Sequence, residues 1–199
     1  MEIHNLSPGG FAANCYLVSE GSDAVLIDCT VPAADLCRVL EEKGLTLRAV
    51  LLTHGHFDHI LTADAVRDAT GVPLLVHRDD AELLCDSDKN AFSRFFGHTR
   101  TWRAAERRIA GGDTLIFGEL SFTVLHTAGH TRGSVTYQAG NIAFTGDTLF
   151  VGDVGRTDLY GGDAAALARS LRSLSMLPSD TAVYPGHGGS APLCKALPY

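Results

Sequence analysis

Paired cysteines are missing from this chain. Its five cysteines are scattered, odd in number and never in a CxxC spacing. A disulfide framework or a thiolate zinc site requires cysteines in regular pairs, so we expect neither. We expect all five to be buried thiols: Cys15, Cys29, Cys37, Cys85 and Cys194.

Long apolar runs and a targeting segment are missing too. Met1 to Asn5 contain neither a basic stretch nor the apolar core of a signal peptide. No apolar run approaches the roughly 20 residues that a membrane-spanning helix requires. We expect a cytoplasmic protein without a membrane partner.

Basic residues are in deficit. Sixteen Lys and Arg oppose 23 Asp and Glu, which gives a formal charge of −7. Without an overall positive field the chain is not attracted to nucleic acid, and an anionic substrate would need locally placed cations. We expect a small-molecule substrate and no nucleic-acid partner.

The composition is otherwise that of an ordinary globular protein, 45% hydrophobic and 20% charged over 199 residues. A chain of this length can bury a core without disulfides, and we expect a single domain over 1–199.

Apolar runs rich in β-branched residues alternate with helical patterns, which indicates an α/β fold with sheets sandwiched between helical layers. The region 85–108 has little periodicity and is predicted to be a partly helical excursion near a site, with a packed surface hairpin as the alternative. Helices are expected from Pro32 to Gly44, from near His59 to Gly71 and over 163–175, and strands at 13–19, 23–28, 47–52, 73–76, 114–117, 120–125, 134–138, 141–145 and 181–184.

The densest cluster of metal-ligand residue types follows the strand at 47–52. Three histidines and one aspartate fall within six residues. His54 and His56 can aim at one point because the glycine between them allows a close backbone turn. Asp58 and His59 would lie on the first turn of the next helix and face a second point nearby. The motif therefore suits two neighbouring metal ions better than one.

Further ligand candidates follow three other strands. His130 comes after the strand at 120–125, Asp147 after 141–145 and His187 after 181–184. Loops at the carboxyl ends of strands gather into sites in α/β architectures. We therefore expect these side chains to converge on the 54–59 segment.

The motifs THGHFDH, HTAGHT, TGD and PGHG, in this order, resemble those of the metallo-β-lactamase superfamily. The similarity extends from Asn14 to His187, and GRTDL at 155–159 makes the chain look most like the glyoxalase II (hydroxyacylglutathione hydrolase) branch. The resemblance implies an αββα sandwich of two mixed sheets flanked by helices, with the site at one edge.

The resemblance also implies a dinuclear metal site. We expect two divalent ions, zinc first, with iron or manganese as alternatives, because an all-His/Asp site accepts each of them. The first ion would be held by His54, His56 and His130, the second by Asp58, His59 and His187, and Asp147 would bridge both.

The predicted activity is hydrolysis of thioesters such as S-lactoylglutathione. Water shared by two divalent cations loses a proton near neutral pH, and that hydroxide would attack the acyl carbon. Asp58 and Asp147 would be the carboxylates of this catalytic site.

Three residues near the motifs have two interpretations each. Asp28 ends a strand where the family has an aspartate that orients a ligating histidine, and the alternative is a cap on the next turn. Arg156 would anchor an anionic substrate, or pair with Asp153 or Asp158. Tyr160 would line the substrate pocket or belong to the core.

The remaining histidines are not assigned as ligands. With seven ligands already placed, His126 is expected to be a loop residue or to support a ligand. Solvated or hydrogen-bonded side chains are expected at His4, His77 and His98.

Other activities give different expectations. Glyoxalase II itself carries a C-terminal helical domain that contacts glutathione, whereas this chain ends twelve residues after His187, so glutathione is one acyl carrier among several. A persulfide dioxygenase holds one iron with two His and one Asp, and the intact second ligand set favours hydrolysis over it. A complete ligand set argues against a non-catalytic metal-binding module, and no specific feature supports a β-lactamase or a nuclease.

Overall fold

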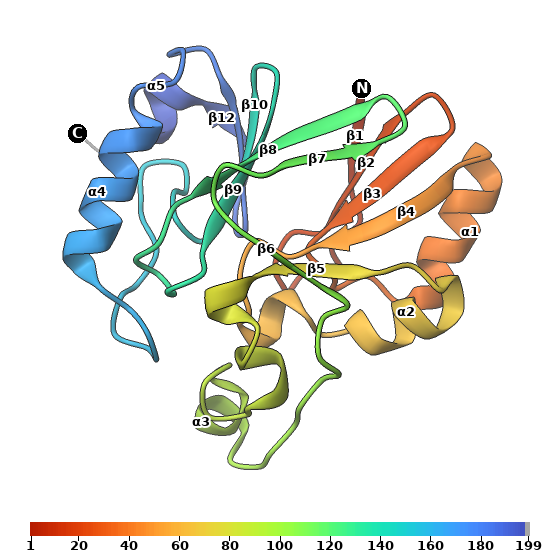
Figure 1. The fold of residues 1–199 in the computed structure, drawn as a ribbon, viewed down its shortest axis with the longest axis horizontal. Coiled ribbons are helices and arrows are strands. Elements are labelled where there is room, and N and C mark those ends of the chain that lie inside the picture. Colours follow the sequence, from red (N-terminus) through yellow and green to blue (C-terminus); the bar gives the residue numbers. More distant parts are fainter. Residues whose placement is uncertain (198–199) are drawn as a thin grey trace.

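A computed structural model describes residues 1–197 as two six-stranded sheets packed face to face (Figure 1). In the first sheet the strands at the N-terminal edge are antiparallel, and the pairs from β3 to β6 are parallel. Its order is β1 (Glu2–Asn5), β2 (Tyr16–Glu20), β3 (Asp23–Ile27), β4 (Thr46–Leu51), β5 (Leu74–His77) and β6 (Arg107–Ile109).

The second sheet is built from the C-terminal half. Its only parallel pair among the described strands is β10 with β11. The order is β12 (Ala191–Pro192), β11 (Ala182–Pro185), β10 (Ile142–Gly146), β9 (Val135–Ala139), β8 (Leu120–His126) and β7 (Thr114–Phe117). Both sheets are therefore mixed, as the resemblance implied.

Side chains on both faces of the central strands are buried, whereas β7 and β8 expose alternate side chains. Val25 of β3 points into the core between the sheets, where it joins Phe122 and Tyr137. Leu26, the next residue, points the other way, toward helices α1 (Ala33–Lys43) and α2 (Ala63–Thr70). On the second sheet α4 (Ala164–Leu174) and α5 (Leu193–Ala196) cover the outer face. The predicted αββα sandwich is confirmed.

The helix predicted from near His59 begins later than expected. A short 3₁₀ turn spans Phe57–His59, and α2 starts only at Ala63. The intervening backbone bonds to the segment after β3 instead of along a helix: Cys29 N–H donates to the His59 carbonyl, and Thr62 N–H donates to the Cys29 carbonyl. This pairing holds the metal-ligand motif against the end of the first sheet.

The region 85–108 is partly helical, not a hairpin. It contains α3 (Phe92–Phe96), followed by an extended stretch that leads to β6. Figure 1 shows α3 standing apart from the two sheets at the bottom of the molecule. None of the helices within residues 1–197 is long and apolar enough to cross a membrane.

Candidate metal centre

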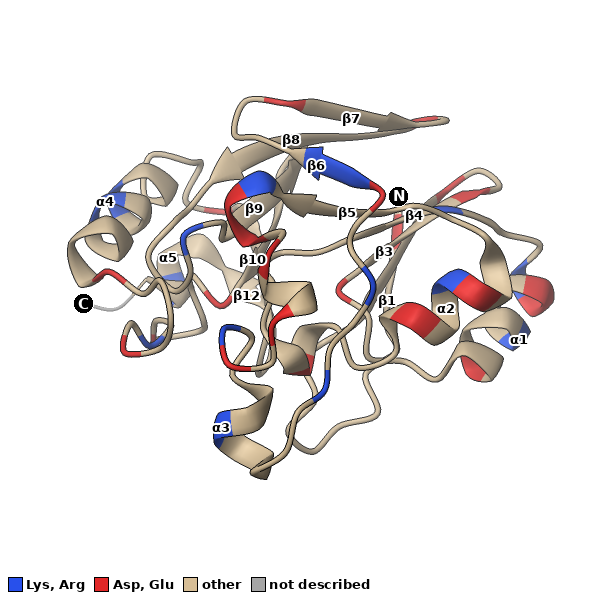
Figure 2. Ribbon diagram, turned by 60° about the horizontal axis from the view of Figure 1, so that its bottom comes forward, with Lys and Arg blue, Asp and Glu red and all other residues tan. Residues whose placement is uncertain are grey.

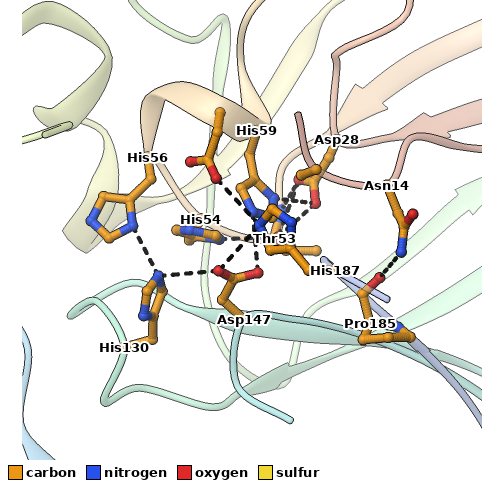
Figure 3. Close-up of polar contacts among 12 residues, drawn as sticks. Asn14, Asp28, Thr53, His54, His56, His59, His130, Asp147, Pro185 and His187 are labelled. Atoms are coloured by element: carbon orange, nitrogen blue, oxygen red, sulfur yellow. Dashed lines mark hydrogen bonds and ion pairs between the residues drawn. The ribbon is translucent and has the colours of Figure 1, made fainter. Parts of the chain in front are cut away.

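The predicted ligand residues meet at one edge of the sandwich, where four strands end (Figure 3). The segment after β4 supplies His54, His56, Asp58 and His59. The loops after β8, β10 and β11 supply His130, Asp147 and His187.

Three histidines form one donor set. His56 Nδ1 lies 2.9 Å from His130 Nε2. The His54 ring centroid lies 4.8 Å from that of His56 and 4.7 Å from that of His130. All three side chains are buried. One nitrogen of each ring lies within 4.8 Å of the others, which is within the reach of a single cation.

Asp58, His59 and His187 form a second donor set beside the first. His187 Nε2 lies 3.2 Å from Asp58 Oδ2. Asp147 stands between the two sets: its Oδ1 is 3.2 Å from His59 Nε2, and its Oδ2 is 3.6 Å from His130 Nε2. A carboxylate in this position can contact a cation in either set.

Buried polar atoms without hydrogen-bond partners indicate metal binding independently of the motifs. His54 Nε2, His59 Nε2 and Asp147 Oδ1 are buried and have no well-aligned hydrogen-bond partner, although the last two atoms lie 3.2 Å apart. Polar atoms buried this deeply normally have a partner, and a cation would supply it. Imidazole and carboxylate donors suit zinc, iron and manganese.

The electrostatics of the first donor set and of Asp147 favour the protonation states that bind metals. Burial lowers the pKa of His54 well below its ordinary value and that of His56 to about 3, so both rings are neutral. Burial alone would raise the pKa of Asp147, but its histidine neighbours, His59 first, outweigh it and hold that pKa below its ordinary value. The Asp147 carboxylate is therefore ionised. Burial would lower the pKa of His59, but the Asp28 and Asp147 carboxylates outweigh it and raise that pKa well above its ordinary value.

Asp28 lies behind the second donor set. Its carboxylate accepts hydrogen bonds from His59 Nδ1 at 2.7 Å and from the backbone N–H of Thr53 at 2.8 Å. The backbone of Asp28 is left-handed, with φ +57°. Because Nδ1 donates to Asp28, Nε2 is the nitrogen that faces the centre, and a cation bound there would displace the proton on it. This is the geometry expected of a carboxylate that orients a ligating histidine.

Other ligands are held by backbone contacts. His130 Nδ1 donates to the Arg156 carbonyl at 2.8 Å. The loop that carries His187 is fixed by Asn14, whose Nδ2 donates to the carbonyls of Pro185 and Gly188, both at 2.9 Å; Figure 3 shows the first contact.

Two glycines of the motifs are required by close packing. A Cβ on Gly186 would overlap Asp147 Oδ1 and lie 2.7 Å from His59 Cε1. A Cβ on Gly55 would lie 2.7 Å from Leu83 Cβ. Gly55 therefore permits a close approach to the 3₁₀ turn Leu83–Cys85. Its φ is not in the positive range that requires glycine, so packing explains this glycine better than the backbone turn predicted from the sequence.

Asp80 is a residue of the centre that the sequence analysis missed. It is fully buried and accepts hydrogen bonds from Gly55 N–H at 3.0 Å, Thr131 Oγ1 at 2.6 Å and Gly133 N–H at 2.7 Å. It thereby joins the loop that carries His54 and His56 to the loop that carries His130. Its position in the turn after a parallel strand is a signal that it shares with Asp79, so the sequence points to this turn but not to Asp80 itself.

A cavity of about 430 Å³ opens above the centre and is lined in part by His56, Asp58, His130, Asp147 and His187. Arg156 lines it as well, and its guanidinium pairs with the Asp158 carboxylate at 2.6 and 2.7 Å. The structural pair is therefore present, and the anchoring of an anionic substrate by Arg156 stays a prediction.

The other side chains considered from the sequence lie outside the cavity lining within residues 1–197. The Tyr160 hydroxyl donates to Glu82 Oε1 at 2.9 Å. The His126 ring stacks on the buried ring of His77, with 4.2 Å between their centroids.

The family model described as the metallo-beta-lactamase superfamily matches residues 8–187. The chain belongs to this superfamily, whose members are generally hydrolytic enzymes that bind divalent metals.

Two curated relatives are similar over nearly their whole length. An uncharacterized protein of Mycobacterium tuberculosis, Rv2581c, is 42% identical, and the match covers 96% of this chain and 92% of the relative. Hydroxyacylglutathione hydrolase GloC of Haemophilus influenzae is 33% identical over 94% of this chain and 91% of its own length.

Three solved structures share the fold at substantial identity. BLEG-1 B3 metallo-beta-lactamase matches with a TM-score of 0.92 and 35% identity, over 98% of this chain and 95% of that one. TTHA1623 in a di-iron-bound form has a TM-score of 0.85 and 36% identity, over 96% and 95%. ETHE1 from Myxococcus xanthus has a TM-score of 0.80 and 32% identity, over 98% and 80%.

Proposed function

We propose that this protein is a dinuclear metal-dependent hydrolase of thioesters. The observation that carries the proposal is the second donor set, in which His187 Nε2 lies 3.2 Å from Asp58 Oδ2 beside His59. A single-iron oxygenase has less use for this set than a hydrolase with two ions, which needs ligands for its second ion. The similarity to GloC and to the di-iron form of TTHA1623 supports the same choice.

Each residue of the centre has a distinct role in the proposed reaction. When bound, two divalent cations supply an ionised water as the nucleophile and polarise the acyl carbonyl. The neutral rings of His54 and His56 offer lone pairs to the first position. Asp147 keeps its negative charge between the two positions, and Asp28 fixes the orientation of His59.

The cavity supports a substrate with a good leaving group. Within the described lining, every acidic or basic side chain except Arg156 belongs to the donor sets, and a guanidinium does not give up its proton. No other side chain there is free to protonate a departing group. A thiolate departs without such help, whereas an amide nitrogen needs a proton.

The proposal is tested by measuring metal content and two activities on one preparation. We expect about two ions per chain and hydrolysis of S-lactoylglutathione or another acyl thioester, without oxygen consumption on glutathione persulfide. Asp58→Asn should reduce the metal content toward one ion and lower kcat about 100-fold or more. Asp180→Asn, at the exposed end of β11 opposite to His187, is the matched control.

The opposite pattern would refute the proposal. One iron per chain, oxygen uptake with the persulfide and an unaffected Asp58→Asn variant would instead assign the activity of a persulfide dioxygenase.

A further inference from the structure

Four phenylalanines form one wall of the cavity, here called the phenylalanine wall: Phe11, Phe57, Phe95 and Phe96. The ring centroid of Phe57 lies 5.5 Å from the centroids of Phe95 and Phe96, and the Phe11 centroid lies 5.8 Å from the Phe96 centroid. The same cavity is lined by metal-ligand residues, so the wall and the centre face one space.

The outer rings of the wall are unusually exposed. Phe11 is 59% exposed, Phe95 53% and Phe96 42%. A contiguous exposed apolar surface beside a polar centre is typical of a ligand site, because exposing it to water is otherwise unfavourable. Figure 2 shows that α3, which carries Phe95 and Phe96, has no acidic residue and a single basic one, Arg94.

The base of the wall is rigid. Phe57 is buried and packs edge to face on Phe92, with 5.7 Å between centroids, and Phe92 in turn packs on Trp102. Phe57 is also part of the 3₁₀ turn that carries Asp58 and His59. The aromatic surface is therefore held in a fixed position relative to the metal-ligand residues.

Little positive charge is available in the cavity. Arg156 is the one basic side chain other than histidine in the described lining, and Asp158 already pairs with its guanidinium. Arg94 lies 4.0 Å from the same Asp158 carboxylate. The lining therefore offers aromatic surface, and not free cations, to the part of a substrate that does not react.

We propose that the phenylalanine wall binds an aromatic or branched apolar group of the substrate, so that the preferred thioester carries such a group next to the scissile bond. The inference rests on the proposed hydrolase function and adds the substrate class. The apolar group belongs either to the acyl part or to the departing thiol, and the rings recognise both by the same burial of apolar surface.

Two substrate pairs test the proposal. S-mandeloylglutathione differs from S-lactoylglutathione by a phenyl group in place of a methyl group on the acyl side. S-benzyl thioacetate and S-acetylglutathione vary the thiol side, with an alkyl thiolate as the leaving group in both. We expect the wild type to favour the aromatic member of one pair about tenfold or more in kcat/KM, and that pair identifies the side.

Substitutions locate the preference. Phe95→Ala and Phe11→Ala should reduce the selectivity ratio by about tenfold, mainly through KM, with the metal content unchanged. Met176→Ala removes a side chain that is 82% exposed and outside the cavity lining, and should leave the ratio as it is. Thioester hydrolysis with the same ratio in the wild type and both phenylalanine variants would overturn the inference while leaving the proposed function intact.

If no thioester is hydrolysed, a binding measurement tests the phenylalanine wall separately from the proposed hydrolase function. Calorimetry of the metal-loaded protein with mandelate and with lactate should show tighter mandelate binding that is lost in Phe95→Ala. Equal binding of both acids overturns the inference. So does a dimer in light scattering that Phe95→Ala converts to a monomer, since the wall would then be a contact between two copies of the chain.

Discussion

His59 donates a hydrogen bond through Nδ1 to Asp28 at 2.7 Å, and both side chains are buried. The contact orients the ring of a candidate metal-ligand residue from outside the candidate metal centre. It also links β3 to the motif after β4, because Asp28 accepts the Thr53 N–H as well. One buried carboxylate thereby couples the end of the first sheet to the second donor set.

Asp28→Asn should weaken metal binding about 10- to 100-fold without unfolding the protein. Asparagine tolerates the left-handed backbone at φ +57°, so the turn is retained. It loses the negative charge that strengthens the bond from His59, and its NH₂ group would face one of the donors on Thr53 and His59. Competition with a chromophoric chelator gives the affinity. Asp28→Ala, which strains the backbone as well, should also lower the free energy of unfolding. An affinity for Asp28→Asn within twofold of the wild type would exclude a role for the charge.

Gly186→Ala should reduce metal retention at least tenfold. The added Cβ would overlap Asp147 Oδ1 and press on His59 Cε1, so residues from both sides of the centre must move. Metal content after gel filtration is the measurement. Gly189→Ala is the control, because its Cβ would meet no atom within 4 Å. Equal metal content in all three proteins would show that the loop adjusts freely.

The strand ends that build the centre were predictable from local sequence. Each ligand loop follows an apolar run and contains glycine beside histidine or aspartate, so type and position are visible together. The helix after His59 was placed too early because its competing partner, the backbone of Cys29, lies 30 residues away in sequence. The strands β1, β6 and β12 were missed because runs of 4, 3 and 2 residues are too short to show an alternating pattern. In addition, β6 pairs with β5, a segment far away in sequence.

The sequence could not show which of two nearby residues of the same type is buried. Asp79 is exposed and Asp80 is fully buried, and what separates them is a contact with Gly133, 53 residues further on. Within α3, Phe92 points into the core while Phe95 faces the cavity. A helix of five residues has no periodicity that would distinguish these two directions.

Asp80→Asn should destabilise the protein by about 1–3 kcal/mol. The carboxylate accepts from Gly55, Thr131 and Gly133, and an amide would turn an NH₂ group toward one of these donors. Urea unfolding of the metal-loaded protein measures the change. The exposed neighbour Asp79→Asn should stay within about 0.5 kcal/mol of the wild type. Two variants of equal stability would contradict the assigned role of Asp80.

His77→Asn should make stability less dependent on pH in the acidic range. Burial lowers the pKa of His77 to about 4, and His126 adds to the effect against the opposing Asp79 and Asp113. In the unfolded chain a histidine titrates near pH 6.5. Between these values only the unfolded chain takes up the proton, so stability falls as the pH drops from about 6.5 to about 4, by at most ~3 kcal/mol.

In the wild type the Asp79 N–H donates a hydrogen bond to His77 Nδ1 at 3.3 Å. The side-chain oxygen of asparagine can accept this bond in place of the imidazole, while the titrating group is removed. Urea unfolding of the wild type and the variant at pH 7 and pH 5 gives the difference between their pH dependences, in which the metal-ligand histidines cancel. The wild type should lose more stability than His77→Asn over this interval, and the exposed His98→Asn should follow the wild type. A parallel decline in all three proteins would mean that His77 ionises with the same affinity for protons in the folded and unfolded chains.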